Sequence, residues 1–287
     1  MHIVVCIKQV PDSTHIRVHP VTNTIMRQGV PAIINPYDLF AIEEALRLKD
    51  RHGGHVTVIS MGPPQAEPAL RKALSFGCDD ALLITDKAFS GADTLATSYV
   101  LAAAIRTLHA ERPVDLVFTG KQTIDGDTAQ VGPGIAKRLD LGLLTYVARI
   151  VELDLSGRRI VVERRAEGGV QVLETALPVL ITMLEGTNEL RFATTPDMFR
   201  AARAEIRTWD RTQTGIEDIK YVGLKGSPTV VSRVFGPTPR AERAVCIDFD
   251  PANPDAAAAA LLDKVLAESP RAAKELARRR HGAVAEE

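Results

Sequence analysis

The stretch GKQTIDGDTAQVGPG, residues 120–134, decides how the chain is expected to fold. It follows the apolar run Leu116 to Thr119, which is typical of a buried parallel strand, and it leads into residues 135–139, which predict a helix. The stretch is therefore expected to be a strand-to-helix turn. In an open parallel sheet such turns lie at the carboxyl ends of the strands, where ligands bind.

The composition of this turn suits a phosphate group. The free N–H groups and the positive dipole end of the following helix favour an anion by about 0.3–1 kcal/mol. Gly126, Gly132 and Gly134 leave room for the anion, and Thr128 and Gln130 supply polar donors. Asp125 and Asp127 would repel a phosphate unless they cap the helix or accept from ribose or backbone donors. On loop chemistry alone, a capped glycine-rich loop without a ligand is an equal alternative.

Length and charge exclude several classes of protein. The 287 residues can bury a large core, either as one α/β domain or as one domain with an arm. Lys and Arg number 35 against 36 Asp and Glu, a formal net charge of -1, which argues against a nucleic-acid partner. No stretch reaches the ~18 apolar residues of a membrane span. The N-terminal apolar run is too short for a signal peptide.

The cysteines and histidines do not predict a metal site. Cys6, Cys78 and Cys246 are far apart, and none belongs to a Cys-x-x-Cys pair. A disulfide framework, an iron–sulfur cluster and a structural zinc site all lack their usual sequence support. The seven histidines are equally scattered. These features fit a reduced cytoplasmic compartment.

Upstream of residue 120 the pattern alternates between strands and helices. Residues 2–10, 55–60, 81–85 and 116–119 predict strands, and residues 37–49, 66–76 and 95–108 predict helices. Asn35 and Asp93 are expected N-caps, and Pro36 suits a first helical turn. This order predicts a doubly wound, mainly parallel α/β sheet. No Gly-x-Gly-x-x-Gly follows the first strand, which favours a Rossmann-like variant over a standard dehydrogenase.

Downstream the pattern changes to antiparallel strands. Residues 146–153, 159–165 and 170–175, with the apolar run 179–183, predict an extension at the edge of the same sheet. Two short runs, 16–18 and 24–26, predict a small hairpin, and a short basic helix is expected after Pro196. Residues 209–239 are irregular, and residues 255–280 predict a long helix. We expect an α/β domain over 1–205 and a C-terminal arm over 206–287.

Several motifs, in the same order along the chain, resemble the β subunit of electron transfer flavoprotein over nearly the whole length. They are residues 3–10 (IVVCIKQV), 35–38 (NPYD) with 43–45 (EEA), 61–63 (MGP), 120–134 and 191–194 (RFAT). The resemblance implies a Rossmann-like fold of the adenine nucleotide α-hydrolase type. It also implies an α subunit that holds FAD, contacted by the C-terminal arm, and an adenine nucleotide in the β subunit.

The resemblance also places the nucleotide contacts. Matched motif by motif, they fall on Cys6, Asn35, Pro36, Tyr37, Asp38, Met61, Thr123, Asp125, Gly126, Asp127, Thr128, Ala129, Gln130, Val131, Gly132 and Gly134. The redox chemistry would belong to flavin and nicotinamide, so no side chain is expected to act as a catalytic nucleophile or base.

Two branches of this family differ in the nucleotide. One carries AMP in the β subunit and serves acyl-CoA dehydrogenases, whereas the other carries a second FAD there, takes hydride from NADH and bifurcates its electrons. Residues 91–98 and 125–133 are similar to the FAD-binding branch, which adds Asp93, Thr94 and Thr97 to the expected contacts. Asp93 and Thr94 would open a second helix N-terminus for a longer ligand. The plain alternative is a helix cap, with AMP as the nucleotide.

Three further stretches, residues 26–31, 163–171 and 223–229, resemble the nitrogen-fixation-associated Fix subgroup. That resemblance implies NADH as donor, and quinone and ferredoxin or flavodoxin as acceptors. It also implies a membrane-associated flavin and iron–sulfur quinone reductase, to which the complex would be peripheral. Thr195 stands before Pro196 where AMP-type members carry leucine, which argues against docking to acyl-CoA dehydrogenases.

Two other classes of function are weaker. A nucleotide-hydrolysing or adenylylating enzyme would need a pyrophosphate loop or a P-loop, and neither is present. A nucleotide-binding protein without a redox role would not need the irregular segment 209–239 or the long terminal helix.

Overall fold

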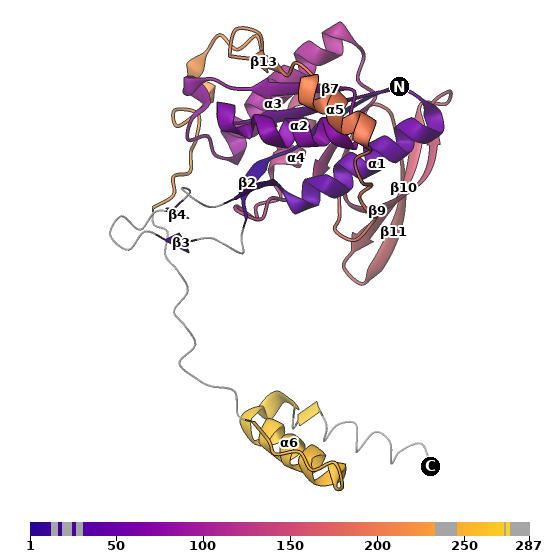
Figure 1. Cartoon of the computed structure of the whole chain (residues 1–287), viewed down its shortest axis with the longest axis vertical. Coiled ribbons are helices and arrows are strands. Elements are labelled where there is room, and N and C mark those ends of the chain that lie inside the picture. Colours follow the sequence, from indigo (N-terminus) through magenta and orange to yellow (C-terminus); the bar gives the residue numbers. More distant parts are fainter. Residues whose placement is uncertain (13–16, 19–24, 27–30, 233–245, 273, 276–287) are drawn as a thin grey trace. The chain divides into compact units, whose positions relative to one another are not determined.

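The computed structural model describes residues 1–12, 17–18, 25–26, 31–232, 246–272 and 274–275. The chain divides into two compact units, Met1–Phe235 and Gly236–Glu287, which are described separately (Figure 1). None of the helices in the described part combines the length and the apolar character needed to cross a bilayer.

The first unit is built on a nine-stranded sheet in the order β11-β10-β9-β12-β8-β1-β6-β7-β13. Its centre is parallel and consists of β1 (His2–Cys6), β6 (His55–Met61), β7 (Asp80–Ile84), β8 (Leu116–Gly120) and β12 (Val179–Met183). Ile3 pairs with Val56 on one side and with Leu116 on the other. These strands are continuously apolar because both of their faces are buried.

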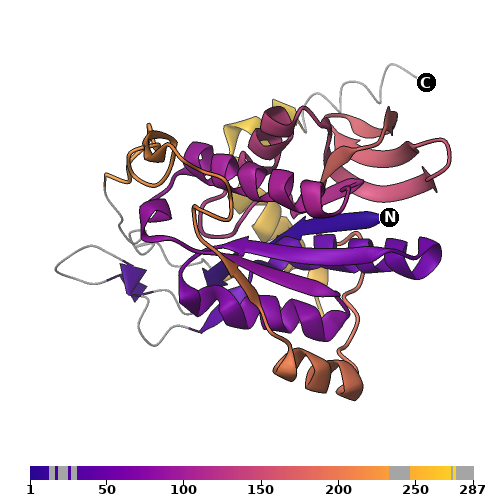
Figure 2. The ribbon, with the colours of Figure 1, turned by 90° about the horizontal axis from the view of Figure 1, so that it is seen from above.

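Helices cover both faces of this sheet (Figure 2). One apolar cluster joins the sheet to α1 (Pro36–His52) and α2 (Glu67–Phe76), and the other joins it to α3 (Thr94–Glu111) and α4 (Val131–Leu139). Alternate residues of β1 enter different clusters, with Val5 in the first and Val4 in the second. Each fully buried aliphatic side chain of this kind contributes about 1.5–3 kcal/mol to folding.

The predicted edge extension is confirmed for three of its strands, whereas residues 179–183, which were expected to belong to it, form β12 inside the parallel part of the sheet, between β8 and β9. β9 (Gly142–Asp154) runs parallel to β12, and β10 (Arg159–Ala166) and β11 (Gly169–Ala176) follow it as an antiparallel hairpin. The fold is therefore the predicted α/β type, with a mixed and mostly parallel sheet.

The first predicted strand, residues 2–10, is in fact two strands. β1 ends at Cys6, and β2 (Gln9–Pro11) leaves the main sheet to pair with β5 (Ala32–Ile34), which the sequence did not predict. Side-chain alternation cannot show such a change of partner, because both strands remain apolar. The small predicted hairpin is present as β3 (Arg17–Val18) and β4 (Ile25–Met26), whereas Ile16 and Thr24 lie outside the described residues.

The segment predicted to be irregular contains one more strand of the sheet. β13 (Arg207–Trp209) pairs in parallel with β7, and Trp209 is buried against the α3 side of the sheet. The basic helix after Thr194 is α5 (Thr195–Arg203), which packs on α2. The described part of the unit also contains the short 3-10 turns η2 (Pro64–Ala66), η3 (Lys87–Phe89) and η4 (Ile219–Tyr221).

The second unit contains α6 (Pro254–Glu268). The sequence predicted a helix over 255–280, but α6 ends before Ser269 and Pro270, because proline lacks an N–H and disfavours helical geometry in the residue before it. Residues 270–272 and 274–275 are helical again, so the predicted helix is interrupted at Ser269. Arg278, Arg279 and Arg280 lie outside the described residues. The apolar side chains of α6, Leu261, Leu262 and Val265, are exposed. The predicted domain boundary after residue 205 stays a prediction.

Candidate functional site

The residues predicted to bind a nucleotide gather at one edge of the sheet. Because β1, β6, β7 and β8 are parallel, their carboxyl ends share this edge. Cys6 and Met61 end β1 and β6, and the starts of α1, α3 and α4 follow the strand ends along the chain. We call this region the carboxyl edge.

Asn35 occupies the N-cap position of α1 as predicted, but its side chain makes no capping hydrogen bond. Its Nδ2 donates to the backbone O of Gln122 at 2.8 Å, and its Oδ1 accepts from the N–H of Ile124 at 3.1 Å. The Asn35 side chain is thus directed at the loop after β8 rather than at its own helix. Pro36 begins α1 as expected, where a missing N–H costs nothing.

Asp38, in the first turn of α1, is also buried. Its carboxylate accepts from the N–H of Lys8 at 2.7 Å and from the N–H of Gly120 at 3.1 Å. Burial raises the pKa of Asp38 to about 7, although the hydrogen bonds it accepts act in the opposite direction. Asp38 therefore ties the chain after β1 to the end of β8.

Gly120 allows α1 to approach β8 this closely. A Cβ on Gly120 would lie 2.5 Å from Asp38 Oδ1 and 2.6 Å from the backbone C of Tyr37. Tyr37 itself lies beneath the ammonium group of Lys121, which is 5.0 Å from the centre of its ring.

The two aspartates of the loop are both paired. Lys8 Nζ contacts Asp125 at 2.8 Å, and Gln122 Nε2 donates to Asp127 Oδ1 at 2.8 Å. Burial acts to raise the pKa of Asp125, but Lys8 outweighs it and the pKa is lowered. Asp125 thus carries a compensated charge, which weakens its repulsion of a nearby anion.

The loop has an unusual backbone. Thr123 O accepts from the N–H groups of Gly126 and Asp127, which closes a tight turn. Asp127 and Ala129 have positive φ angles of 51° and 53°, a conformation that residues with a side chain rarely adopt. Thr128 lies between them and is exposed. Strained backbone of this kind is concentrated at functional sites.

α4 begins at Val131, one turn earlier than predicted, and this changes the role of two glycines. A Cβ on Gly132 would lie 2.9 Å from Thr119 Oγ1, and one on Gly134 would lie 2.6 Å from Ser98 Oγ. Both glycines lie inside α4 and let it pack against the sheet and α3. This packing is a sufficient reason for both positions to be glycine, and the expectation that they also leave room for a phosphate stays a prediction. A Cβ on Gly126 would meet only Thr123 Oγ1, at an ordinary contact distance of 3.4 Å.

The starts of α3 and α4 differ in their capping. At α3, Asp93 accepts from the N–H of Ala96 at 3.0 Å, and so it is a true N-cap. At α4, Gln130 occupies the N-cap position without any capping bond from its side chain, whose Oε1 accepts from Thr94 Oγ1 at 2.8 Å. The first N–H groups of α4 are left available to an anion, which is the feature that a bound phosphate requires.

Asp93 also holds a segment that the sequence analysis did not connect with it. Asp93 Oδ2 accepts from the N–H and the hydroxyl of Thr229, and the N–H of Asp93 donates to Ser227 Oγ at 2.8 Å. Thr97 lies in the same first turn, where its N–H donates to the backbone O of Asp93.

The remaining predicted residues lie on the α3 side of the sheet. Cys6 is buried there, Met61 is half-buried beside the same cluster, and Val131 packs against it. Burial strongly raises the pKa of the Cys6 thiol. Cys6 is therefore a packing residue of the strand end and not a reactive thiolate.

The sequence analysis missed Lys8, Lys121 and Gln122 as parts of the site. Lys8 lies within the quoted motif of residues 3–10, and Lys121 and Gln122 lie within the quoted loop, so all three positions gave a signal. Their partners could not be found from spacing, because Lys8 and Asp125 are 117 residues apart.

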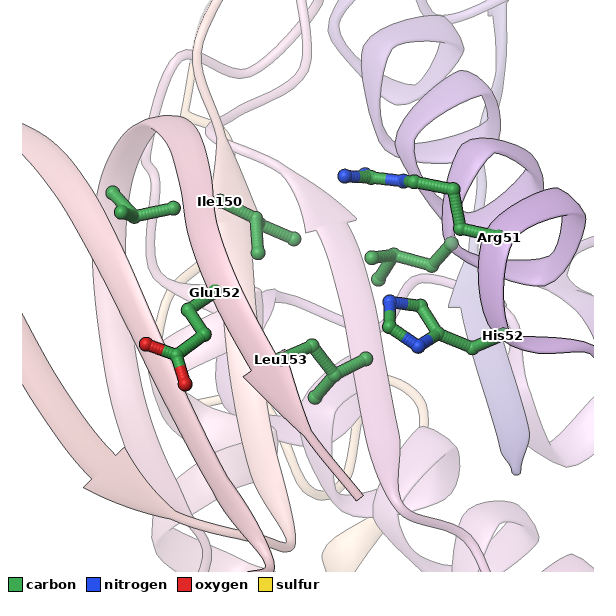
Figure 3. A pocket seen from close by; sticks show the side chains of 7 residues that line it. Arg51, His52, Ile150, Glu152 and Leu153 are labelled. Carbon is green, nitrogen blue, oxygen red and sulfur yellow. The ribbon is translucent and has the colours of Figure 1, made fainter. Parts of the chain in front are cut away.

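Two pockets in the described chain lie away from the carboxyl edge. One lies between the C-terminal part of α1 and β9 and is lined by Arg51, His52, Ile150, Glu152 and Leu153 (Figure 3). The other lies at the amino ends of the strands, around His2 and His55. Within the described ranges, no cluster of three or more His, Cys, Asp or Glu side chains could hold a metal ion.

Comparison with known proteins supports a single family. The model of the electron transfer flavoprotein domain matches residues 22–214. Protein FixA of Azotobacter vinelandii is 67% identical over 279 residues, which cover 97% of this chain and 99% of that protein. Protein FixA of Azorhizobium caulinodans is 63% identical over 96% of this chain and 98% of its own. The electron transfer flavoprotein subunit beta of Clostridium acetobutylicum is 48% identical, over 81% and 87% respectively.

Proposed function

The chain belongs to the electron transfer flavoprotein family, and on that premise we propose that it is the β subunit of an electron-transferring heterodimer that supports nitrogen fixation. In this proposal the β subunit binds FAD and receives hydride from NADH. One electron leaves through the FAD of the α subunit toward quinone, and the other leaves toward ferredoxin or flavodoxin. The proposal extends the family assignment by naming the nucleotide and the route of the electrons.

The observation that carries the nucleotide site is the uncapped start of α4. Its first N–H groups lack a side-chain partner, and they follow a loop whose charged residues are already paired. A pyrophosphate at this point would accept hydrogen bonds from those N–H groups, and the positive end of the helix dipole would attract its negative charge. The residues present therefore fit the phosphate part of an adenine nucleotide.

In the mechanism, this chain binds and orients and does not perform the redox chemistry. When bound, FAD would supply the group that accepts a hydride and releases electrons singly. The α4 start would hold the phosphates, and the exposed hydroxyl group of Thr128 would be a further donor from the loop. The buried thiol of Cys6 would close the floor of the site without taking part in chemistry.

The partners follow from this role. The α subunit would contact the arm formed by residues 206–287, and α6 offers three exposed apolar side chains for that purpose. A flavin and iron–sulfur quinone reductase would receive the electrons of the high-potential route. The residues that contact NADH are not assigned.

One observation favours the alternative, an AMP-binding β subunit of a single-flavin electron transfer flavoprotein. Asp93 caps α3, so a phosphate at that helix start would meet a carboxylate. Only the uncapped α4 start is then available to a phosphate group. The second helix start that the sequence analysis offered for a longer ligand therefore gives less support to FAD than expected.

The nucleotide content of the co-expressed α/β heterodimer tests the proposal. Released nucleotides are separated by chromatography, and flavin is quantified by absorbance. Two FAD and no AMP per heterodimer would support the proposal and justify an anaerobic titration with NADH. One FAD with one AMP would return the protein to the single-flavin electron shuttle.

A further inference from the structure

Two buried side chains at the start of α1 hold three segments that are distant in sequence. Asn35 bonds to the backbone of Gln122 and Ile124, at 2.8 and 3.1 Å. Asp38 bonds to the backbone of Lys8 and Gly120, at 2.7 and 3.1 Å. Together they join α1, the end of β1 and the first residues of the loop after β8.

Neither side chain is available to a ligand. Asn35 is 0% and Asp38 is 4% exposed, and the polar atoms of both are directed at backbone groups. An adenine nucleotide at the carboxyl edge could contact the backbone nearby. It could not bond to the Asn35 or Asp38 side chain itself, because the buried backbone N–H groups that these side chains now bind would lose their partners, which is costly. The two residues therefore act on the site through the loop.

The ion pair between Lys8, just after β1, and Asp125 of the loop adds little to these bonds. The pair Lys8 and Asp125 has side chains that are 47% and 19% exposed. Solvent-exposed ion pairs contribute little to holding a conformation. The backbone bond from the N–H of Lys121 to Met183 O, at 2.9 Å, and the bond from Thr94 to Gln130 hold the two ends of the loop. Asn35 and Asp38 are the buried side chains that fix its first part, residues 120–124.

We propose that Asn35 and Asp38 are positioning residues, which hold the loop of residues 120–130 so that it and the α4 start can receive the nucleotide phosphates. This inference rests on the proposed nucleotide site, but not on whether the nucleotide is FAD or AMP. It replaces direct contact, expected from the family resemblance, with an indirect role for both side chains.

The carboxylate of Asp38 makes this arrangement sensitive to pH. When ionised, the carboxylate accepts from the N–H groups of Lys8 and Gly120, one on each oxygen. In the protonated form one of the two oxygens carries a hydrogen, and only the other remains a full acceptor. The ionisable groups from neighbouring elements are Cys6 and Lys8 on the β1 side, and Lys121 with its partner Glu185 on the β8 side. The pKa of the buried Cys6 thiol is raised, and that of Glu185 is lowered by its own backbone N–H and by Lys121. Asp38 is thus the acidic group of this set that titrates near neutral pH.

The test measures FAD binding by the full chain in complex with its α subunit, after the β-site nucleotide has been removed. The variants are Asp38→Asn, Asn35→Ala and, as a matched control, Asp115→Asn. Asp115 accepts from the N–H of His2 at 3.0 Å, which is the same chemistry at the opposite end of β1. FAD is the main probe because its pyrophosphate does not titrate between about pH 6 and 8, and AMP is measured in parallel. Thermal unfolding is recorded for every variant.

We expect Asp38→Asn and Asn35→Ala to weaken binding at least about tenfold at pH 8, and Asp115→Asn to leave it within about twofold. Wild-type binding should weaken from about pH 8 to about pH 6, whereas binding by Asp38→Asn should be flat. Equal losses in Asp38→Asn and Asp115→Asn, or superimposable pH profiles, would overturn the inference.

Other outcomes separate this inference from the proposed function. If the wild type binds AMP and not FAD, the proposed two-flavin function fails. The positioning role is then tested by the AMP affinities of the three variants relative to the wild type. If the wild type binds neither nucleotide, both proposals fail. Should Asp38→Asn not fold, Asn35→Ala and the pH profile of the wild type still decide the question.

Discussion

At the scale of single residues, the carboxyl edge is defined by close approach. Gly120 ends β8 directly beneath the first turn of α1, and its N–H is bonded to a carboxylate from that turn. A Cβ on Gly126, in the same loop, would make only an ordinary contact, at 3.4 Å from Thr123 Oγ1. Two glycines of one loop therefore have different reasons to be glycine.

Gly120→Ala should destabilise the chain by about 1–3 kcal/mol, because the new methyl group would overlap the backbone of Tyr37 and force α1 away from the sheet. Gly126→Ala is the matched control and should change the free energy of unfolding by less than about 0.5 kcal/mol. Urea denaturation of both variants measures the difference. Equal stabilities would contradict the packing described here.

Asp38 gives a pH dependence of stability with a definite sign. Its pKa in the folded chain is raised to about 7, against about 3.9 in an unfolded chain. Between these values the native state binds a proton that the unfolded state has released, so this contribution to stability is lost as the pH rises through about 7. Relative to Asp38→Asn, the unfolding free energy of the wild type should fall from about pH 5 to about pH 8 in urea titrations. Parallel curves would show that Asp38 does not titrate in this window.

Stability and ligand affinity should thus respond to this proton in opposite directions. Protonation relieves the cost of a buried charge, and it also removes one of the acceptors that hold the loop. A protein that became both less stable and weaker in nucleotide binding at low pH would require a different titrating group.

At the scale of elements, α3 and α4 meet through their first turns but serve different purposes. Thr94 of α3 bonds to Gln130 before α4, so the two helix starts are joined. The carboxylate of Asp93 completes the α3 start and anchors Thr229, whereas the α4 start has no side-chain cap. The start of α3 therefore anchors the C-terminal part of the first unit, whereas the start of α4 has N–H groups free for a ligand.

Asp93→Ala should cost more stability than the loss of an ordinary cap. A cap contributes about 0.5–2 kcal/mol, and Asp93 in addition accepts from the backbone and hydroxyl of Thr229. Thr194→Ala, which removes the local cap of α5, is the control. Hydrogen exchange should become faster in residues 223–229 in the first variant only. Unchanged protection there would mean that Asp93 does not anchor this segment.

At the scale of the whole molecule, the two compact units differ in how they use apolar residues. The first unit encloses two apolar clusters, one on each face of the sheet. In the second unit, α6 buries none of its residues within the chain. A helix whose apolar side chains stay exposed is expected to bury them against a partner.

The double variant Leu261→Ser with Leu262→Ser should weaken association with the α subunit by at least about tenfold, because each leucine would lose about 1.5–3 kcal/mol of burial. Asp263→Ser, on the same helix, should have little effect. Affinity is measured by calorimetry or by recovery of the α subunit with tagged β subunit. The unfolding free energy of the β subunit alone should not change, since both leucines are exposed. Equal affinities for the two variants would remove α6 from the interface.

The sequence by itself determined the α/β class, the order of the central elements and the edge at which the predicted residues gather. Continuous apolar runs such as Leu116 to Thr119 mark strands that are buried on both faces, and the alternation of strands with amphipathic segments leaves few ways to arrange them. Asp93 was also recognised, because a cap acts on N–H groups only three residues away.

Only the tertiary structure decided what the polar side chains at that edge do. Asn35 looked like a helix cap and instead bonds to a loop 87 residues away, and Gly132 and Gly134 looked like parts of that loop and instead lie inside α4. Trp209 lay in a segment without periodicity, yet it ends a strand of the main sheet. Local spacing shows which groups a residue can reach along its own element. Partners brought together by packing depend on the distance between elements, which periodicity does not encode.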